Sequence, residues 1–182
     1  DGDFFYSGHL IDLVKDLNHN LAPNPSFEYD AIGSSPSGWN VQLGTVTVQA
    51  HTRTDTLGGK CAYFPGDGVY HRIRSKYFIP VYSGQTIFGR CYAKLNAGAD
   101  FYFGMEWSDD TYAYFTSGGT HDWTIRGGNL TVPAGVTWGR IWLFNYAGNT
   151  GAMYVDDIYV GVGELFIDGK LWFGGDYYRD VN

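Results

Sequence analysis

The chain has 182 residues, 44% of them hydrophobic, and a net charge of −7, which suits one domain with a buried core and short extensions. An acidic chain without a basic stripe does not bind phosphates well, so we expect no nucleic-acid partner. No apolar run approaches the ~20 residues that span a bilayer, so we expect no membrane insertion. The chain opens on Asp1 without a secretory signal, and we expect a processed protein or a piece of a longer one.

The first predicted element is a short amphipathic helix over residues 9–17. Its apolar positions at helical spacing are Leu10, Leu13, Val14 and Leu17. So short a helix is marginal alone and must dock either on a neighbouring subunit or on the chain's own domain. Residues 19–28 then predict a loop and a first strand, in which Pro23 and Pro25 limit regular pairing.

From Trp39 onward, short alternating segments are separated by glycine-rich turns. The predicted strands lie near 40–50, 60–64, 69–74, 76–81, 85–95, 100–107, 111–116, 121–131, 136–145 and 152–160. The 26 glycines and the 18% of aromatic residues are typical of β-structure with tight turns. Many short strands without intervening helices predict an all-β fold, an antiparallel β-sandwich of the jelly-roll type.

The tail predicts a C-terminal hairpin, because Asp168-Gly169 stands between apolar flanks within residues 165–173. The predicted organisation is an N-terminal extension at 1–18, a β-domain at 19–162 and a C-terminal hairpin and tail at 163–182. An isolated hairpin is unstable in water. Extensions at both ends therefore favour a homo-oligomer or contact with other structural proteins of an assembly.

Strand alternation separates two kinds of face, because successive side chains point to opposite sides. One face is apolar, and the other combines aromatic rings with charged groups. The residues of the second face are Arg90, Tyr92, Tyr102, Glu106, Tyr112, Tyr114, Arg140 and Trp142. Aromatic rings stack on pyranose C–H groups, while the polar groups bond sugar hydroxyls. The pattern predicts a glycan-binding face; the alternative is an ordinary solvent-facing sheet or a surface covered by a neighbour.

The sequence contains no recognisable catalytic motif. Adjacent carboxylates occur at 109–110 and 156–157, and because neighbouring strand residues face opposite ways, neither pair suits a glycosidase. There is no GxSxG elbow, HExxH helix or phosphate-binding glycine loop, and the five histidines lack ligand spacing. We therefore expect no enzyme. Cys61 and Cys91 either join two strands or remain buried thiols.

Three short segments stand out at the ends of the β-rich region. They are Asn24-Pro25-Ser26-Phe27-Glu28, Gly38-Trp39 and Tyr154-Val155-Asp156-Asp157-Ile158. These segments resemble the carbohydrate-binding modules of families 4 and 9, over roughly residues 19–162 and loosely in between. The resemblance implies a β-jelly roll of galactose-binding-like topology, without catalytic activity, that binds glycan chains along a cleft over one sheet.

The resemblance also implies a structural calcium ion near the two ends of the domain. The matching ligand positions are Asn24, Glu28 and Asp156. Two carboxylates that meet repel each other and need a cation or hydrogen-bond donors. The alternative is that Glu28 caps backbone amides and Asp156 fixes a turn.

The two extensions depart from such a module, and similar domains occur in bacteriophage tail fibres, baseplates and capsid decorations. The sequence therefore predicts a non-catalytic adhesion module that binds an oligo- or polysaccharide at a virion surface or in another extracellular assembly. One alternative is a purely structural capsid or tail decoration protein with no sugar ligand. Another is an accessory module of a glycoside hydrolase.

Overall fold

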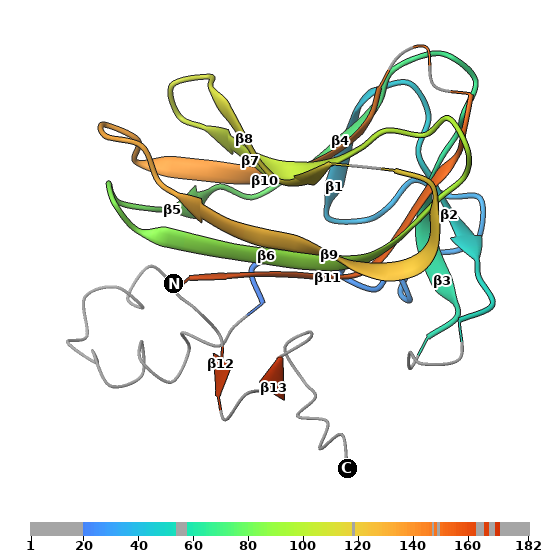
Figure 1. Ribbon diagram of the computed structural model, residues 1–182, viewed down its shortest axis with the longest axis horizontal. Coiled ribbons are helices and arrows are strands. Elements are labelled where there is room, and N and C mark those ends of the chain that lie inside the picture. The colour runs from blue at the N-terminus through green and yellow to red at the C-terminus, as the bar shows by residue number, and fades with distance from the viewer. Residues whose placement is uncertain are drawn as a thin grey trace.

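Antiparallel β-strands build the fold (Figure 1). The computed structural model describes residues 20–53, 58–117, 119–146, 148 and 150–162, and the backbone of 166–167 and 170–171. The strands are β1 (Trp39–Leu43), β2 (Thr47–Ala50), β3 (Lys60–Phe64), β4 (His71–Ser75), β5 (Ile79–Pro80), β6 (Thr86–Leu95), β7 (Phe101–Trp107), β8 (Tyr112–Ser117), β9 (His121–Thr131), β10 (Trp138–Asn145), β11 (Met153–Val162), β12 (Phe166–Ile167) and β13 (Lys170–Leu171). The helix predicted at 9–17 lies outside the described residues. Within them, no helix has the length and hydropathy to cross a membrane.

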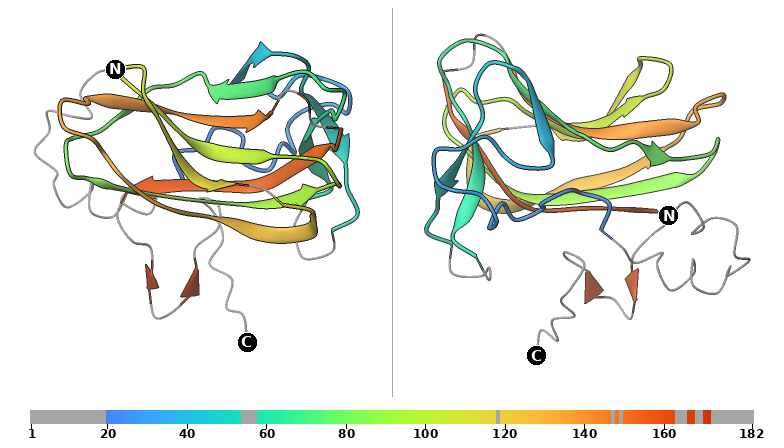
Figure 2. Two further views of the ribbon diagram at one scale, coloured as in Figure 1. Left: turned by 45° about the horizontal axis from the view of Figure 1, so that its top comes forward. Right: turned by 180° about the vertical axis from the view of Figure 1, so that it is seen from behind.

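The strands form two layers, which Figures 1 and 2 show lying one over the other. Sheet A has the order β1-β4-β10-β7-β8, with β5 paired to β10, and sheet B has the order β2-β3-β11-β6-β9. Every pairing is antiparallel. The predicted all-β antiparallel sandwich is therefore confirmed. Strands β12 and β13 pair with each other, in line with the predicted hairpin.

One predicted strand, at 40–50, is in fact two strands. Gly44 separates β1 from β2 and has a φ of +62°, a conformation that favours glycine. A Cβ at this position would overlap the carbonyl oxygen of Tyr70 and the ring of His71. The turn at Gly44 sends β1 to sheet A and β2 to sheet B.

The core lies between the sheets and follows the predicted alternation. From β7 it takes Phe101, Phe103, Met105 and Trp107, each at most 1% exposed. Burying one such side chain contributes about 1.5–3 kcal/mol. Cys61 and Cys91 are free thiols on β3 and β6, and β11 lies between those two strands. Burial raises the pKa of Cys61 to about 12.

The N-terminal segment lies along the last strand of the sandwich. The N–H of Leu21 donates to the carbonyl of Val160 at 2.8 Å, and that of Ile158 donates to the carbonyl of Pro25 at 2.9 Å. Residues 20–38 form loops without a strand, so the first strand predicted within 19–28 is wrong. The prolines explain this difference, because a proline lacks the N–H that regular pairing needs.

Candidate functional site

A continuous group of aromatic side chains covers the outer face of sheet A. Because alternate residues of β7 and β10 fill the core, the residues between them point outward. We call this group the aromatic row, and it consists of Tyr70, Tyr102, Tyr112, Tyr114, Trp142, Phe144 and Tyr146. Ring centroids within the row lie 5.1 to 6.5 Å apart. These spacings are those of interacting aromatic pairs.

At one end of the row, two exposed tyrosines stand over a buried tryptophan. Trp142 is only 4% exposed, whereas Tyr112 is 43% and Tyr114 is 52% exposed. Both tyrosine rings approach the indole edge-on, with centroids at 5.4 Å and 5.3 Å. Trp142 therefore supports the two tyrosines, and the tyrosine rings are what a ligand would meet.

The other end of the row comes from the loops beside β4 and β10. Tyr70 stacks on Phe144 with a centroid distance of 5.4 Å and an interplanar angle of 10°. Tyr146 meets Tyr70 edge-on at 5.1 Å. Tyr70 and Tyr146 are 40% and 45% exposed. Tyr70 fell within the strand predicted at 69–74 but was not among the residues predicted for the glycan face; in the structure it lies just before β4.

Charged groups lie beside the aromatic row on the same face. Glu106 on β7 is 5% exposed and accepts from Arg74 Nη1 at 3.1 Å and from Arg140 Nη2 at 3.3 Å. A buried carboxylate needs such partners, because its desolvation is costly. Glu106 and Arg140 were predicted at this face. Arg74 was not, because only the register between β4 and β10 brings it there.

The predicted glycan face divides between the two sheets. Tyr102, Glu106, Tyr112, Tyr114, Arg140 and Trp142 lie together on sheet A, whereas Arg90 and Tyr92 lie on β6 of sheet B. The Arg53 guanidinium lies over the Tyr92 ring, 3.7 Å from its centroid. Alternation separated inward from outward residues correctly on β6, β7 and β10, but it contains no information on which sheet a strand joins.

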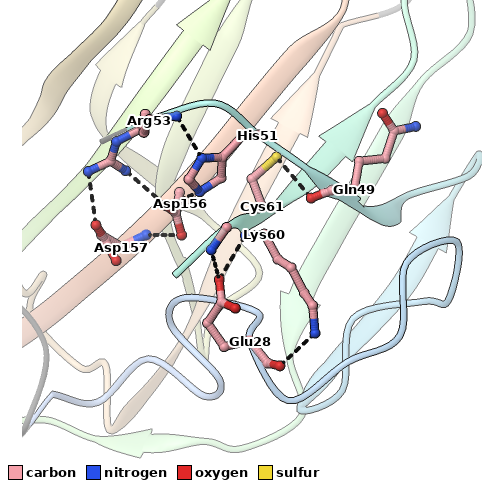
Figure 3. A network of polar contacts seen from close by, with 9 residues as sticks. Glu28, Gln49, His51, Arg53, Lys60, Cys61, Asp156 and Asp157 are labelled. Atoms are coloured by element: carbon pink, nitrogen blue, oxygen red, sulfur yellow. Dashed lines mark hydrogen bonds and ion pairs between the residues drawn. The ribbon is translucent and has the colours of Figure 1, made fainter. Parts of the chain in front are cut away.

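The carboxylate of Asp156 is buried and faces two basic side chains (Figure 3). Arg53 Nη1 lies 2.9 Å and His51 Nε2 lies 3.0 Å from Asp156 Oδ2. Asp157 Oδ2 lies 3.0 Å from Nη2 of the same arginine. Burial raises the pKa of Asp156 to about 6, while His51 and Arg53 act in the opposite direction.

The expectation that Asp156 and Asp157 point opposite ways is therefore wrong. The register of β11 against β6 shifts between Asp156 and Tyr159, and Asp157 has a φ of +46°. A bulge of this kind turns one side chain out of the regular alternation. Both carboxylates consequently reach the Arg53 guanidinium.

Glu28 is held by backbone amides and not by Asp156. Its Oε1 accepts the N–H groups of Gly59 at 2.8 Å and Lys60 at 2.7 Å. The Lys60 ammonium donates to the carbonyl oxygens of Glu28 at 2.8 Å and Asp30 at 2.7 Å (Figure 3). Asn24 Nδ2 donates to Asp30 Oδ2 at 2.6 Å. The alternative in which Glu28 caps amides matches this geometry.

The three predicted calcium ligands thus bond to separate partners. Across the described ranges, no group of three or more His, Cys, Asp or Glu side chains could hold a metal ion. Arg53 and Lys60 lie against oxygens that a calcium ion would need. The arrangement of Asn24, Glu28 and Asp156 therefore does not fit a calcium site, and calcium binding stays a prediction from the resemblance.

Comparison with known proteins shows which known folds this chain resembles. No protein-family model matches the chain, and no curated protein matches its sequence. A family 61 carbohydrate-binding module solved with β-1,4-galactotriose is similar at 14% identity and a TM-score of 0.60, over 80% of this chain and 99% of that one. A family 16 carbohydrate-binding module is similar at 17% identity and a TM-score of 0.57, over 78% and 99%.

A bacteriophage domain has a similar fold. The enzymatically active domain of tailspike protein 4 from Bacteriophage CBA120 is similar at 15% identity and a TM-score of 0.59. The match covers 79% of this chain but only 21% of the tailspike chain. At these identities the likeness concerns the fold alone. The chain has the β-sandwich fold of carbohydrate-binding modules.

Proposed function

We propose that this chain is a non-catalytic module that binds a polysaccharide across the outer face of sheet A. The observation that carries the proposal is the aromatic row, in which four tyrosines are 40% to 52% exposed around a buried tryptophan. Exposed ring faces of this kind stack on sugars, and their hydroxyls bond sugar hydroxyls. The row extends over three strands, β7, β8 and β10, and the loops beside β4 and β10, which suits a chain of sugars better than a single ring.

The charged groups of this face support a binding role over a catalytic one. Glycoside hydrolysis needs two carboxyl groups that flank one bond. Glu106 is 5% exposed and its carboxylate is paired with two arginines, so it does not present a free carboxylate to a ligand. Among the described outward-facing residues of the sheet A strands, no second carboxylate accompanies it.

Known modules of the same fold also support glycan binding. The family 61 module was solved with a galactotriose, and a family 22 module with this fold is described as a xylan-binding domain. We also propose that the chain is related to the carbohydrate-binding modules of families 4 and 9, because its segments 24–28, 38–39 and 154–158 resemble theirs. The tailspike likeness supports a place at a virion surface or in another extracellular, oligomeric assembly, where the module would serve adhesion.

A second candidate function uses the same surface. A large exposed aromatic patch also suits contact with another protein. In that case the chain is a structural decoration protein, and a neighbouring subunit covers the aromatic row.

Binding measurements on single tyrosine variants test the proposal. A glycan array selects a polysaccharide, and calorimetry then compares wild type with Tyr114→Ala and Tyr146→Ala. Each variant should bind about tenfold more weakly, which corresponds to about 1.4 kcal/mol. Tyr29→Ala is the matched control, because Tyr29 is 88% exposed in the loop before β1. Absence of binding across the array, with the aromatic row buried in a subunit contact, would favour the structural role.

A further inference from the structure

Three arginines accompany the aromatic row in a chain that is acidic overall. Arg72 and Arg74 lie on β4, and Arg140 lies on β10. The register places Arg72 opposite Phe144, and Arg74 opposite Trp142, on neighbouring strands. Each β4 arginine is therefore one strand away from a ring of the aromatic row.

The single carboxylate that Arg74 and Arg140 contact does not balance the charge of the three arginines. Glu106 is shared between Arg74 and Arg140, so one negative charge faces two positive charges. Arg72 adds a third positive charge, and its Nε, which is buried, has no hydrogen-bond acceptor in the described part of the chain. The Nε atoms of Arg74 and Arg140 likewise have none. The face has an excess of positive charge although the whole chain has a net charge of −7.

The attraction of a charged ligand to this face depends on the charged side chains close to it. At physiological salt, charges farther away than about 8 Å are largely screened. Asp100 and Asp109 lie just before and just after β7 and are exposed. Burial raises the pKa of Tyr102, and the nearby Asp100 carboxylate adds to this rise, while the Asp109 carboxylate bonds Thr111. A ligand that lies over Trp142 and Phe144 is next to Arg74 and Arg72 on the paired strand β4.

We propose that the polysaccharide bound by this face is anionic, with carboxylate or sulfate groups that meet Arg72 and Arg74 while its sugar rings stack on the aromatic row. The inference rests on the proposed function. A guanidinium binds planar anionic groups through paired hydrogen bonds, which are stronger than neutral ones. A neutral glycan would leave the excess positive charge without a partner.

Pairs of polysaccharides that differ in charge test this proposal. Polygalacturonate is compared with its methyl ester, and dextran sulfate with dextran, so that carboxylates and sulfates are examined separately. At least one charged member should bind roughly tenfold or more tightly than its neutral partner. Arg72→Gln should remove this preference. Arg126→Gln, on β9 of sheet B, is the matched control and should retain it.

The outcomes separate the two proposals. Equal binding of charged and neutral members would overturn the anionic preference but leave glycan binding intact. A preference that survives Arg72→Gln would also overturn it, because the charge would act elsewhere. If none of these polymers binds and a neutral glycan from the array does, the anionic preference fails alone. If nothing binds in the array, both proposals fail.

Discussion

At the scale of single residues, the chain's own cations hold the two acidic segments at the ends of the domain. Arg53 lies between Asp156 and Asp157, and Lys60 lies between two carbonyl oxygens of the loop that contains Glu28. The motifs were visible in the sequence, but their partners were not. Arg53 and Lys60 belong to no motif, and the bulge at Asp157 is a local backbone feature that alternation does not predict.

Removal of Arg53 should reveal the cost of a buried carboxylate that has lost its permanent cation. Arg53→Met should lower the free energy of unfolding by about 3–5 kcal/mol near pH 8, because Asp156 loses its arginine and keeps only His51 as a basic neighbour. The pKa of Asp156 is already raised by burial, and this loss raises it further. The folded variant then holds the proton more tightly than the unfolded chain does, so the destabilisation should be smaller at pH 4.5 than at pH 8.

Urea unfolding at the two pH values measures this difference. Lys94→Met is the control, since Lys94 pairs with Asp122 in an exposed ion pair whose removal costs less than about 1 kcal/mol. A destabilisation by Arg53→Met that is the same at both pH values would contradict the proposed role of Asp156.

Lys60 offers a test of the calcium prediction. Lys60→Met should lower the free energy of unfolding by about 1–3 kcal/mol, because two carbonyl oxygens lose their donor. If Lys60 and Arg53 stabilise this region without a metal ion, a chelator should leave the melting midpoint of the wild type unchanged. Exposed Lys76→Met is the control. A midpoint that rises with added calcium would instead support the metal expected from the resemblance.

At the scale of elements, the strands were predictable because their core residues alternate with outward ones. The segment at 40–50 shows where this fails, since a single turn at Gly44 was hidden within an alternating pattern. Arg90 and Tyr92 lie on a different sheet from the other predicted residues for another reason. Pairing between distant strands decides which sheet holds a strand, and alternation within one strand does not report it.

The contact of β7 with β8 depends on a glycine. A Cβ at Gly104 would overlap the carbonyl oxygen of Ala113 on the paired strand, where the register also shifts. Gly104→Ala should therefore destabilise the fold by about 1–3 kcal/mol. It should also weaken polysaccharide binding, because β8 carries Tyr112 and Tyr114. Thermal unfolding and calorimetry measure the two effects.

A glycine with free space around it provides the comparison for that variant. Nothing lies within 4 Å of a Cβ built on Gly59, so Gly59→Ala should change neither stability nor binding. Equal behaviour of the two variants would show that close packing of β7 against β8 is not what positions the tyrosines.

At the scale of the whole molecule, the sandwich presents its aromatic row on one sheet only. Figure 2 shows sheet A and sheet B as separate layers, so a ligand on the outer face of one does not contact the other. The sequence was sufficient to predict a glycan-binding sandwich and most of the residues of this face. The prediction did not include Tyr70, Arg72, Arg74, Phe144 and Tyr146. Strand pairing and loop conformation bring the first three to this face, whereas Phe144 and Tyr146 continue the outward positions of β10.

Protection of tyrosines from chemical modification tests the central claim most directly. Mass spectrometry compares the acetylation of each tyrosine with and without a bound polysaccharide. We predict protection of Tyr70, Tyr112, Tyr114 and Tyr146, the exposed members of the aromatic row. Among the described residues, the exposed tyrosines outside the row are Tyr29, Tyr77 and Tyr82, and these should remain equally reactive. Protection of these three, with the aromatic row unchanged, would contradict the account.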